Sequence, residues 1–349
     1  MRKVTVNASR VYDVIIEKGL LDRSGDEAAR VIKPCKAAIL TDSNVAPLYA
    51  ERLEKSLIAS GFSPIRFTIE AGEASKSAES YLSFLNFLAE NTLTRSDCIF
   101  ALGGGVVGDL AGFVAATYLR GVKFIQIPTT LLAMVDSSVG GKTAIDIPAG
   151  KNLVGAFYQP SLVIGDPDTL RTLPDSVFAD GCAEVIKYGI INDRPLFERL
   201  KSPIKPQIDE VIESCVKNKR DVVNADEHDT GVRQLLNLGH TAAHSIETLS
   251  GFEISHGSAV AIGTVLIARA AEKFGYCPAS DTAEIVEIFK SYSLPTECPF
   301  GADKLTEIAL KDKKRSGGKI NLIVPAGIGN SKIHEIDVTA LEAFFAAGI

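Results

Sequence analysis

Three of the five histidines, His240, His244 and His256, lie close together in the sequence. His240 and His244 are four residues apart, so they share one face if this segment is helical. Imidazole nitrogen is a common ligand of Zn²⁺, and an enzyme site usually has three protein ligands and one open position. The cluster therefore predicts a metal site. The alternative is that each ring is an ordinary core or surface histidine.

A carboxylate is a natural further ligand for such a site. Glu184 lies in an otherwise apolar helical segment (AEVIKY, 183–188), where burying an acid is costly unless a cation compensates its charge. Glu184 is therefore a candidate ligand. The H-E-x-x-H pattern of metalloproteases does not apply, because Thr241 follows His240.

A glycine-rich segment, GGGVVG at 103–108, satisfies G-x-G-x-x-G. It follows a predicted strand at 98–102 and precedes a predicted helix at 109–119, the context in which glycines let backbone N–H groups approach a pyrophosphate. The acidic residue expected about 20 positions later is missing, and Asp42, after an earlier predicted strand, is the alternative ribose partner. The segment predicts a dinucleotide site, with an ordinary tight turn as the alternative.

A polar, glycine-bearing stretch from 136 to 152 shows no strong helix or strand pattern. Its Lys142 resembles the lysine of a nucleoside triphosphate loop, but Asp136 stands where the first glycine of that motif belongs. Each nearby basic residue is by itself most simply a surface charge. Together they predict a pocket for a substrate that carries phosphate and carboxylate: Lys187, Lys219, Arg233, Lys313 and Lys314.

Two kinds of segment must position these groups. Up to about residue 170, β-rich runs alternate with helical stretches, which predicts βαβ units and a mostly parallel sheet. Beyond it helical patterns dominate, and only 320–324 and 332–336 have strand character. The prediction is an α/β domain over 1–170 and a mainly α-helical domain over 171–349.

Composition limits the class of protein. In 349 residues, 46% are hydrophobic and 23% charged, which excludes disordered and coiled-coil chains. The net charge of −6 argues against nucleic-acid binding. The six cysteines include no C-x-x-C pair, and no apolar run approaches the roughly 20 residues of a membrane span. A reduced, cytoplasmic protein without membrane or nucleic-acid partners is expected.

Seven motifs, in order along nearly the whole chain, resemble the 3-dehydroquinate synthase family of the sugar phosphate cyclases. The resemblance implies a Rossmann-like N-terminal domain that binds NAD⁺, a helical C-terminal domain that binds metal and substrate, and a homodimer. The motifs are GGGVVGDLAGF (103–113), PTTLL (128–132), VDSSVGGKT (135–143), AEVIKYG (183–189), LLNLGHT (235–241), HG (256–257) and DKK (312–314).

The resemblance also implies a role for individual residues. Zn²⁺ or Co²⁺ would be held by Glu184, His240 and His256, so that His244 contacts substrate and the metal pair four residues apart is excluded. Arg120 would reach across the dimer interface. Substrate contacts would be Asp136, Lys142, Asn152, Lys187, Lys219, Arg233, Asn237, His244 and one of Lys313 and Lys314. NAD⁺ contacts would be Asp42, Glu73, Lys76, Gly104, Gly105, Val106, Asp109, Thr129, Thr130, Lys142, Lys151 and Thr172.

The implied reaction converts 3-deoxy-D-arabino-heptulosonate 7-phosphate to 3-dehydroquinate and phosphate. It runs through transient oxidation by NAD⁺, phosphate elimination, re-reduction and an intramolecular aldol closure. Three positions depart from the family pattern without removing an ionisable group: Ala243, Ser258 and Cys182. Other sugar phosphate cyclases and metal-dependent polyol dehydrogenases are the alternatives.

Overall fold

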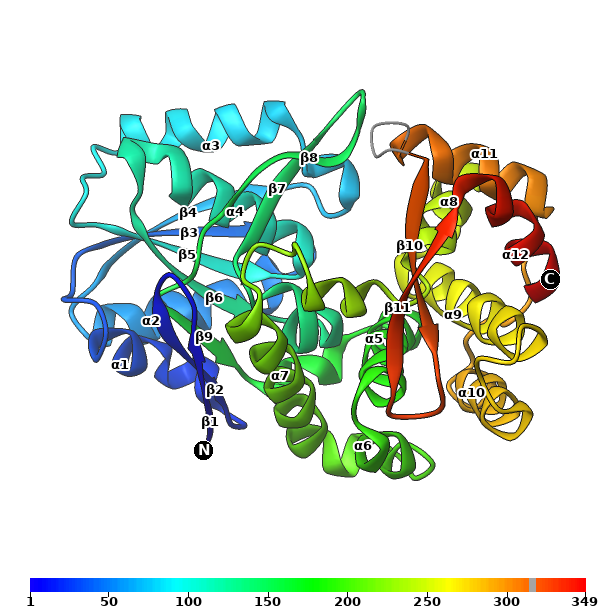
Figure 1. Ribbon diagram of the computed structural model, residues 1–349. Helices are drawn as coiled ribbons and strands as arrows, with labels where there is room; N and C mark the ends of the chain where they lie inside the picture. The colour runs from blue at the N-terminus through cyan, green and yellow to red at the C-terminus, as the bar shows by residue number, and fades with distance from the viewer. Residues whose placement is uncertain (314–317) are drawn as a thin grey trace. The chain divides into compact units, whose positions relative to one another are not determined.

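The computed structural model describes residues 1–313 and 318–349 (Figure 1). It divides into two compact units: unit 1 comprises 1–173 with 208–228, and unit 2 comprises 174–207 with 229–349. The first break lies close to the boundary predicted near residue 170. The sequence did not indicate that helix α7 (Ile208–Ala225) would return to unit 1. It packs against β1 (Arg2–Asn7) and the short turn η5 (Ala133–Ser137), and its buried residues include Val211 and Val216.

Unit 1 is built on a seven-stranded sheet in the order β1-β2-β9-β6-β5-β3-β4. All neighbouring strands are parallel except the edge pair β1 and β2. The predicted α/β domain with a mostly parallel sheet is confirmed. The strands are β1 (Arg2–Asn7), β2 (Val11–Ile16), β3 (Lys36–Asp42), β4 (Ser63–Ile69), β5 (Cys98–Gly103), β6 (Lys123–Pro128) and β9 (Leu162–Gly165).

The apolar run at 98–102 is buried on both sides because helices cover both faces of this sheet. Phe100 and Leu102 belong to the core under α1 and α2, whereas Ile99 and Ala101 belong to the core under α3 and α4. Figure 1 shows the two helix layers on either side of the strands. The helices are α1 (Ser24–Ala29), α2 (Glu51–Ala59), α3 (Ala78–Glu90) and α4 (Gly105–Thr117).

The polar stretch from 136 to 152 has more regular structure than its sequence indicated. After the short π-helical turn η5 (Ala133–Ser137), the chain forms an antiparallel hairpin of β7 (Lys142–Ile147) and β8 (Gly150–Phe157). Glycine, lysine and asparagine have low strand propensity, so the sequence pattern did not predict these strands. Cross-strand pairing and packing of β7 against α4 stabilise them instead.

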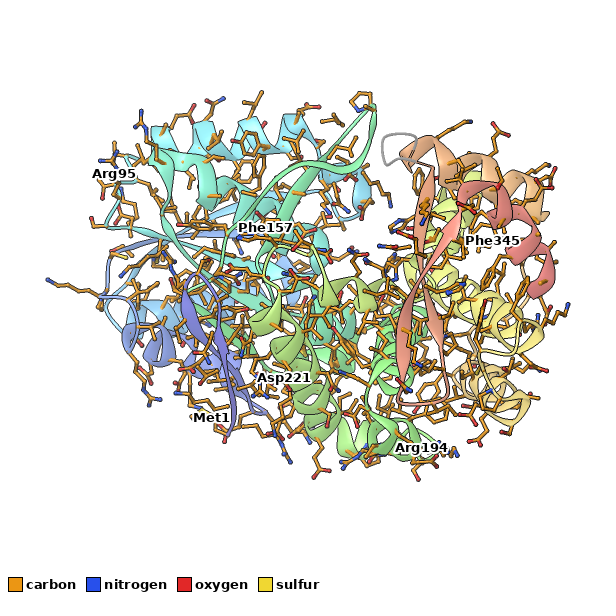
Figure 2. All side chains as sticks on the ribbon, in the orientation of Figure 1. Met1, Arg95, Phe157, Arg194, Asp221 and Phe345 are labelled. Carbon is orange, nitrogen blue, oxygen red and sulfur yellow. The ribbon has the colours of Figure 1, made fainter. Side chains whose placement is uncertain are left out.

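Unit 2 is mainly helical, as predicted, with one antiparallel hairpin of β10 (Lys319–Pro325) and β11 (Ser331–Asp337). Its interior is closely filled by side chains such as Phe345, which is fully buried (Figure 2). In the described parts of the chain, no helix has the length and apolarity needed to cross a membrane. The helices are α5 (Asp175–Ile191), α6 (Arg194–Arg199), η8 (Val232–Asn237), α8 (His240–Leu249), α9 (His256–Lys273), α10 (Ala279–Ser291), α11 (Ala302–Lys313) and α12 (Leu341–Gly348).

Candidate metal centre and nucleotide-binding turn

Three helices of unit 2 bring the three predicted metal ligands together. Glu184 lies in the middle of α5, whereas His240 and His256 are the first residues of α8 and α9. One ligand atom of each lies within 4.8 Å of the others, and no other such group of three occurs in the described residues. Two imidazole nitrogens and one carboxylate oxygen form a donor set that suits Zn²⁺. The residues meet as predicted, while their role as ligands stays a prediction.

Both imidazole rings present the same nitrogen to the centre. Nε2 of His240 lies 3.7 Å, and Nε2 of His256 3.3 Å, from Oε1 of Glu184. The opposite nitrogens have partners of their own: Nδ1 of His240 lies 3.1 Å from the Leu238 carbonyl oxygen, and Nδ1 of His256 lies 3.6 Å from Oε1 of Glu247. A hydrogen on each Nδ1 leaves the Nε2 lone pair available for a cation.

Glu247 was not identified from the sequence. Seven residues after His240 in the same helix, it lies on the same face as His240 and His244. The sequence did contain a signal for it: Glu247 is an acid at a helical position where the buried face of the helix would ordinarily have an apolar residue. The structure buries this carboxylate to 5% exposure.

The charges at the centre suit a divalent cation. Glu184 is fully buried, and the ammonium of Lys187, one turn later in α5, pairs with its other carboxylate oxygen. Burial, reinforced by Lys187, lowers the pKa of His240 to about 3. Burial also lowers the pKa of His256, but Glu184 and Glu247 outweigh it and raise that pKa to about 10. A cation bound at Nε2 would displace the proton that the two carboxylates favour on His256.

A cap on α9 holds His256 next to α5. Oδ1 of Asp180 accepts hydrogen bonds from the Ser258 backbone N–H (3.1 Å) and the Ser255 hydroxyl (2.6 Å). Ser258, one of the departures from the family pattern, is therefore part of this cap. Because Glu184 lies one turn after Asp180 in α5, the same contact places its carboxylate near His256.

Glycine is required at two close approaches between these helices. A Cβ at Gly257 would lie 2.4 Å from both Cα and the carbonyl oxygen of Asp180. Gly239, immediately before His240, has φ +78, and a Cβ there would lie 2.4 Å from the Thr264 hydroxyl. The first turns of α8 and α9, which carry the two histidines, can therefore lie this close to Thr264 and Asp180 only because these positions have no side chain.

We expect Gly257→Ala to lower the free energy of unfolding by about 1–3 kcal/mol, because the new methyl group meets backbone atoms that cannot rotate away. Urea unfolding of the metal-free protein measures the change. Gly165→Ala is the matched control, since its Cβ would meet its nearest neighbour at an ordinary 3.5 Å. An unfolding midpoint equal to that of the unmodified protein would contradict the packing argument for Gly257.

The glycine turn of unit 1 lies between a strand and a helix, as predicted, although the helix begins at Gly105 rather than at residue 109. Strand β5 ends at Gly103, Gly104 precedes α4, and Gly105 begins that helix. Strand β6 ends beside it, where the Thr129 N–H donates to the Gly103 carbonyl oxygen (2.9 Å). Helix N-termini and free backbone N–H groups at the carboxyl edge of a parallel sheet are suited to a pyrophosphate.

A buried ion pair joins two of the predicted NAD⁺ contacts. Lys76 is 5% exposed, and its ammonium donates to Oδ2 of Asp109 at 2.6 Å and also to Oδ1 of Asn152. Burial by itself would lower the pKa of Lys76, but the Asp109 carboxylate raises it above its ordinary value. Asn152, which the resemblance assigns to substrate, thus lies in the Lys76 group.

The other predicted NAD⁺ contacts of unit 1 are less tightly grouped. Asp42 ends β3, and its carboxylate accepts from the backbone N–H groups of Asn44 and Val45, both at 2.9 Å. Elsewhere, Lys151 lies 3.7 Å from Glu73. Three more of the predicted NAD⁺ contacts lie at the ends of elements: Val106 in the first turn of α4, Thr130 after β6, and Thr172 at the end of η6 (Pro167–Thr172).

A second charged pair in unit 1 joins two predicted substrate contacts. The ammonium of Lys219, on α7, donates to the carbonyl oxygen (2.7 Å) and Oδ1 (2.8 Å) of Asp136. The contact forms because helix α7 belongs to unit 1, although it follows the first segment of unit 2 in the sequence. Lys142, at the start of β7, and Arg120 are exposed.

The remaining predicted substrate contacts lie in unit 2 or at the end of the described part. The Arg233 side chain is 1% exposed, and Asn237 ends η8. The ring of His244 lies 5.5 Å from that of His240, but His244 is not in the ligand group. Lys313 ends α11, and Lys314 lies outside the described residues.

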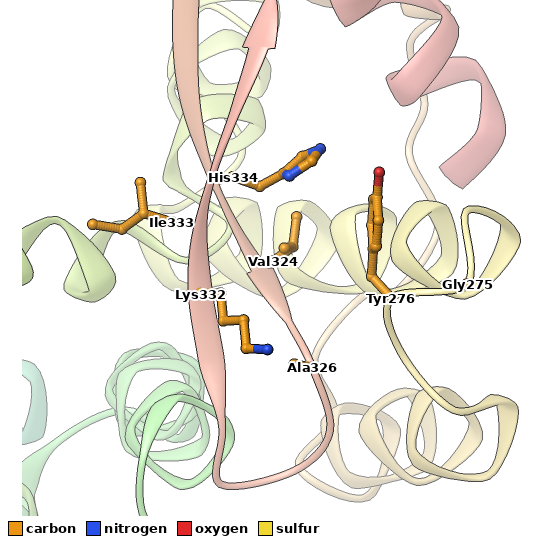
Figure 3. Close-up of a pocket in the computed structure, with 7 residues that line it drawn as sticks. All are labelled: Gly275, Tyr276, Val324, Ala326, Lys332, Ile333 and His334. Carbon is orange, nitrogen blue, oxygen red and sulfur yellow. The ribbon is translucent and has the colours of Figure 1, made fainter.

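A separate hollow of about 290 Å³ lies in unit 2 between the β10–β11 hairpin and the end of α9 (Figure 3). Tyr276, Lys332 and His334 are its polar lining residues. None of the predicted site residues lines it. The hollow is therefore distinct from the metal centre.

The chain is similar to known proteins over nearly its whole length. The family models described as the N-terminal and C-terminal parts of 3-dehydroquinate synthase match residues 66–180 and 181–315. A 3-dehydroquinate synthase of Streptococcus suis is 46% identical over 98% of this chain and 99% of its own length.

Two solved structures share the fold over nearly the whole chain. A 2-deoxy-scyllo-inosose synthase, complexed with carbaglucose-6-phosphate, NAD⁺ and Co²⁺, superposes with a TM-score of 0.88 at 22% identity over 100% of both chains. The 2-epi-5-epi-valiolone synthase of Streptomyces hygroscopicus, with NAD⁺ and Zn²⁺ bound, has a TM-score of 0.87 at 26% identity over 99% of this chain and 98% of its own.

Proposed function

The chain belongs to the 3-dehydroquinate synthase family, and from this premise we propose that it converts 3-deoxy-D-arabino-heptulosonate 7-phosphate to 3-dehydroquinate and phosphate. In reaction class this is a phosphate-eliminating cyclase, a carbon–oxygen lyase. The observation that carries the proposal is the convergence of Glu184, His240 and His256 from three helices. Zn²⁺ or Co²⁺ at this centre and NAD⁺ at the Gly103–Gly105 turn complete it, in line with the contents of the two solved relatives.

A divalent cation held by Glu184, His240 and His256 would lower the pKa of a substrate hydroxyl, and NAD⁺ at the Gly103–Gly105 turn would supply reversible hydride transfer without net redox change. The side chains of the protein hold the cation, the cofactor and the substrate in position for this hydride transfer. Glu184 supplies one negative charge, while His240 and His256 supply neutral nitrogens whose direction is set by their Nδ1 partners. Burial of Glu184 keeps water from competing for its carboxylate.

Basic and amide side chains position the anionic substrate. We assign the phosphate to Lys142, Asn152, Asn237 and His244, and the carboxylate or hydroxyl groups to Arg233 and Lys219. Two hydrogen bonds to Asp136 give the Lys219 ammonium a fixed direction. Such preorganised charges lower the cost of orienting a substrate whose charge moves during elimination.

The quaternary structure and location are also part of the proposal. We assign a cytoplasmic homodimer in which Arg120 is offered to the partner's site. The assignment rests on the family resemblance, and the exposure of Arg120 is compatible with it.

Phosphate release without net NADH distinguishes this function from that of a polyol dehydrogenase. The protein is incubated with the heptulosonate phosphate, catalytic NAD⁺ and Zn²⁺, and phosphate, 3-dehydroquinate and absorbance of NADH are followed together. Equal amounts of the first two products, loss of turnover in EDTA and recovery with Zn²⁺ or Co²⁺ are expected. Steady accumulation of NADH with a simple polyol, and no phosphate release, would contradict the proposal.

Arg233→Ala is expected to weaken substrate binding by about 2–4 kcal/mol, because a desolvated guanidinium that pairs with a carboxylate is lost. The measured quantity is the dissociation constant of the substrate. Arg233→Lys keeps the charge without the planar fork and should recover only part of the affinity. Undiminished binding in Arg233→Ala would remove this residue from carboxylate recognition.

A further inference from the structure

Glu247 is a buried acid that the proposed reaction does not yet use. Its side chain is 5% exposed, although glutamate is rarely buried without a partner. Oε1 of Glu247 lies 3.6 Å from Nδ1 of His256, while Oε1 of Glu184 lies 3.3 Å from Nε2 of the same ring. The imidazole of His256 is therefore held between two carboxylates, one at each nitrogen.

We propose that Glu247 is a positioning residue of the metal centre, which orients His256 and keeps its Nε2 lone pair directed at the cation. The inference rests on the proposed metal site and adds a residue to it. Glu247 does not touch the cation. It acts through the ring of His256.

His256 needs such a partner more than His240 does. The His240 side chain is 14% exposed and has the Leu238 carbonyl oxygen beside Nδ1. The His256 side chain is 37% exposed, so surrounding packing restrains its ring less. A carboxylate beside Nδ1 supplies the missing restraint and makes the imidazole a stronger donor to a metal.

The backbone of Glu247 also restrains the loop that leads to His256. Its carbonyl oxygen accepts from the Phe252 N–H at 2.8 Å and from the Ser250 hydroxyl at 3.0 Å. Substitution of the side chain leaves these backbone acceptors in place. A variant can therefore remove the carboxylate without removing the loop contacts.

The test measures metal affinity directly. Metal-free wild type, Glu247→Gln, Glu247→Asp and Glu253→Gln compete with a chromophoric chelator for Zn²⁺, and the visible spectrum of bound Co²⁺ is recorded. Glu253→Gln is the matched control, because Glu253 is an exposed acid in the loop before His256. Urea unfolding of each metal-free protein separates a loss of affinity from a loss of stability.

Glu247→Gln is expected to bind Zn²⁺ about 10- to 100-fold more weakly and to change the Co²⁺ spectrum. Glu247→Asp should recover part of the affinity, and Glu253→Gln should match wild type. If Glu247→Gln does not fold, an affinity of Glu247→Asp lower than wild type at an equal unfolding midpoint supports the proposal.

Wild-type affinity in the Glu247 variants would overturn the inference while leaving the metal site intact. A lowered unfolding midpoint of the metal-free variants with unchanged affinity would equally overturn it, since Glu247 would then serve packing alone. Absence of Zn²⁺ binding by the wild-type protein would instead overturn the proposed metal site on which the inference depends.

Discussion

Glu184→Gln is expected to lower kcat/KM by more than about 1000-fold, because a metal ion contributes several kcal/mol to such chemistry and each 1.36 kcal/mol is a factor of ten. The amide is neutral and a poor ligand. It also leaves the ammonium of Lys187, buried to 1% exposure, without the charge it pairs with. The measurements are Zn²⁺ content after dialysis and phosphate release.

Glu198→Gln is the control for this substitution, because Glu198 is a half-exposed acid of unit 2 that pairs with a surface lysine. It should retain wild-type Zn²⁺ content and turnover. Full Zn²⁺ content in Glu184→Gln together with near-normal turnover would exclude Glu184 as a ligand.

Lys76→Met is expected to lower the free energy of unfolding by about 1–3 kcal/mol, because it leaves the Asp109 carboxylate, whose side chain is only 20% exposed, without its cation. Burial raises the pKa of Asp109 above its ordinary 3.8, although Lys76 opposes this effect. Without the lysine the pKa should rise further. Urea unfolding at several pH values measures the effect.

The sign of the pH dependence follows from that raised pKa. A carboxyl group whose pKa is higher in the folded state contributes stability below about pH 3.8, and this contribution is lost as pH rises through the folded value. Lys76→Met should therefore lose more stability relative to wild type at pH 8 than at pH 5. Adding Asp109→Asn should remove this dependence.

Lys55→Met is the control for Lys76→Met, since Lys55 forms an exposed ion pair with Glu51 in α2. Its unfolding midpoint should be unchanged, because exposed pairs contribute little. A pH-independent loss of stability in Lys76→Met would contradict the prediction, because it would show that removal of Lys76 does not shift the pKa of Asp109 in this pH range.

Local patterns in the sequence were sufficient for much of the fold. Continuous apolar runs such as 98–102 predicted buried strands, because both faces of a parallel sheet are covered. The same patterns did not predict the hairpin of β7 and β8, because pairing between the two strands stabilises residues that have low strand propensity. They also did not predict that α7 belongs to unit 1, because an apolar helix face does not specify which neighbour it packs against.

By itself the sequence determined the chemical types at the site: an acid in an apolar helix, a histidine cluster and a glycine turn after a strand. Residue types and spacing left open which of them meet; the family resemblance implied one set of three, and the tertiary structure supplies the physical reason. His240 and His244 share a helix face, yet the residues that gather around Glu184 are His240 and His256, because the starts of α8 and α9 converge on α5. The same convergence brought in Glu247, whose contact with His256 no spacing within one helix could reveal.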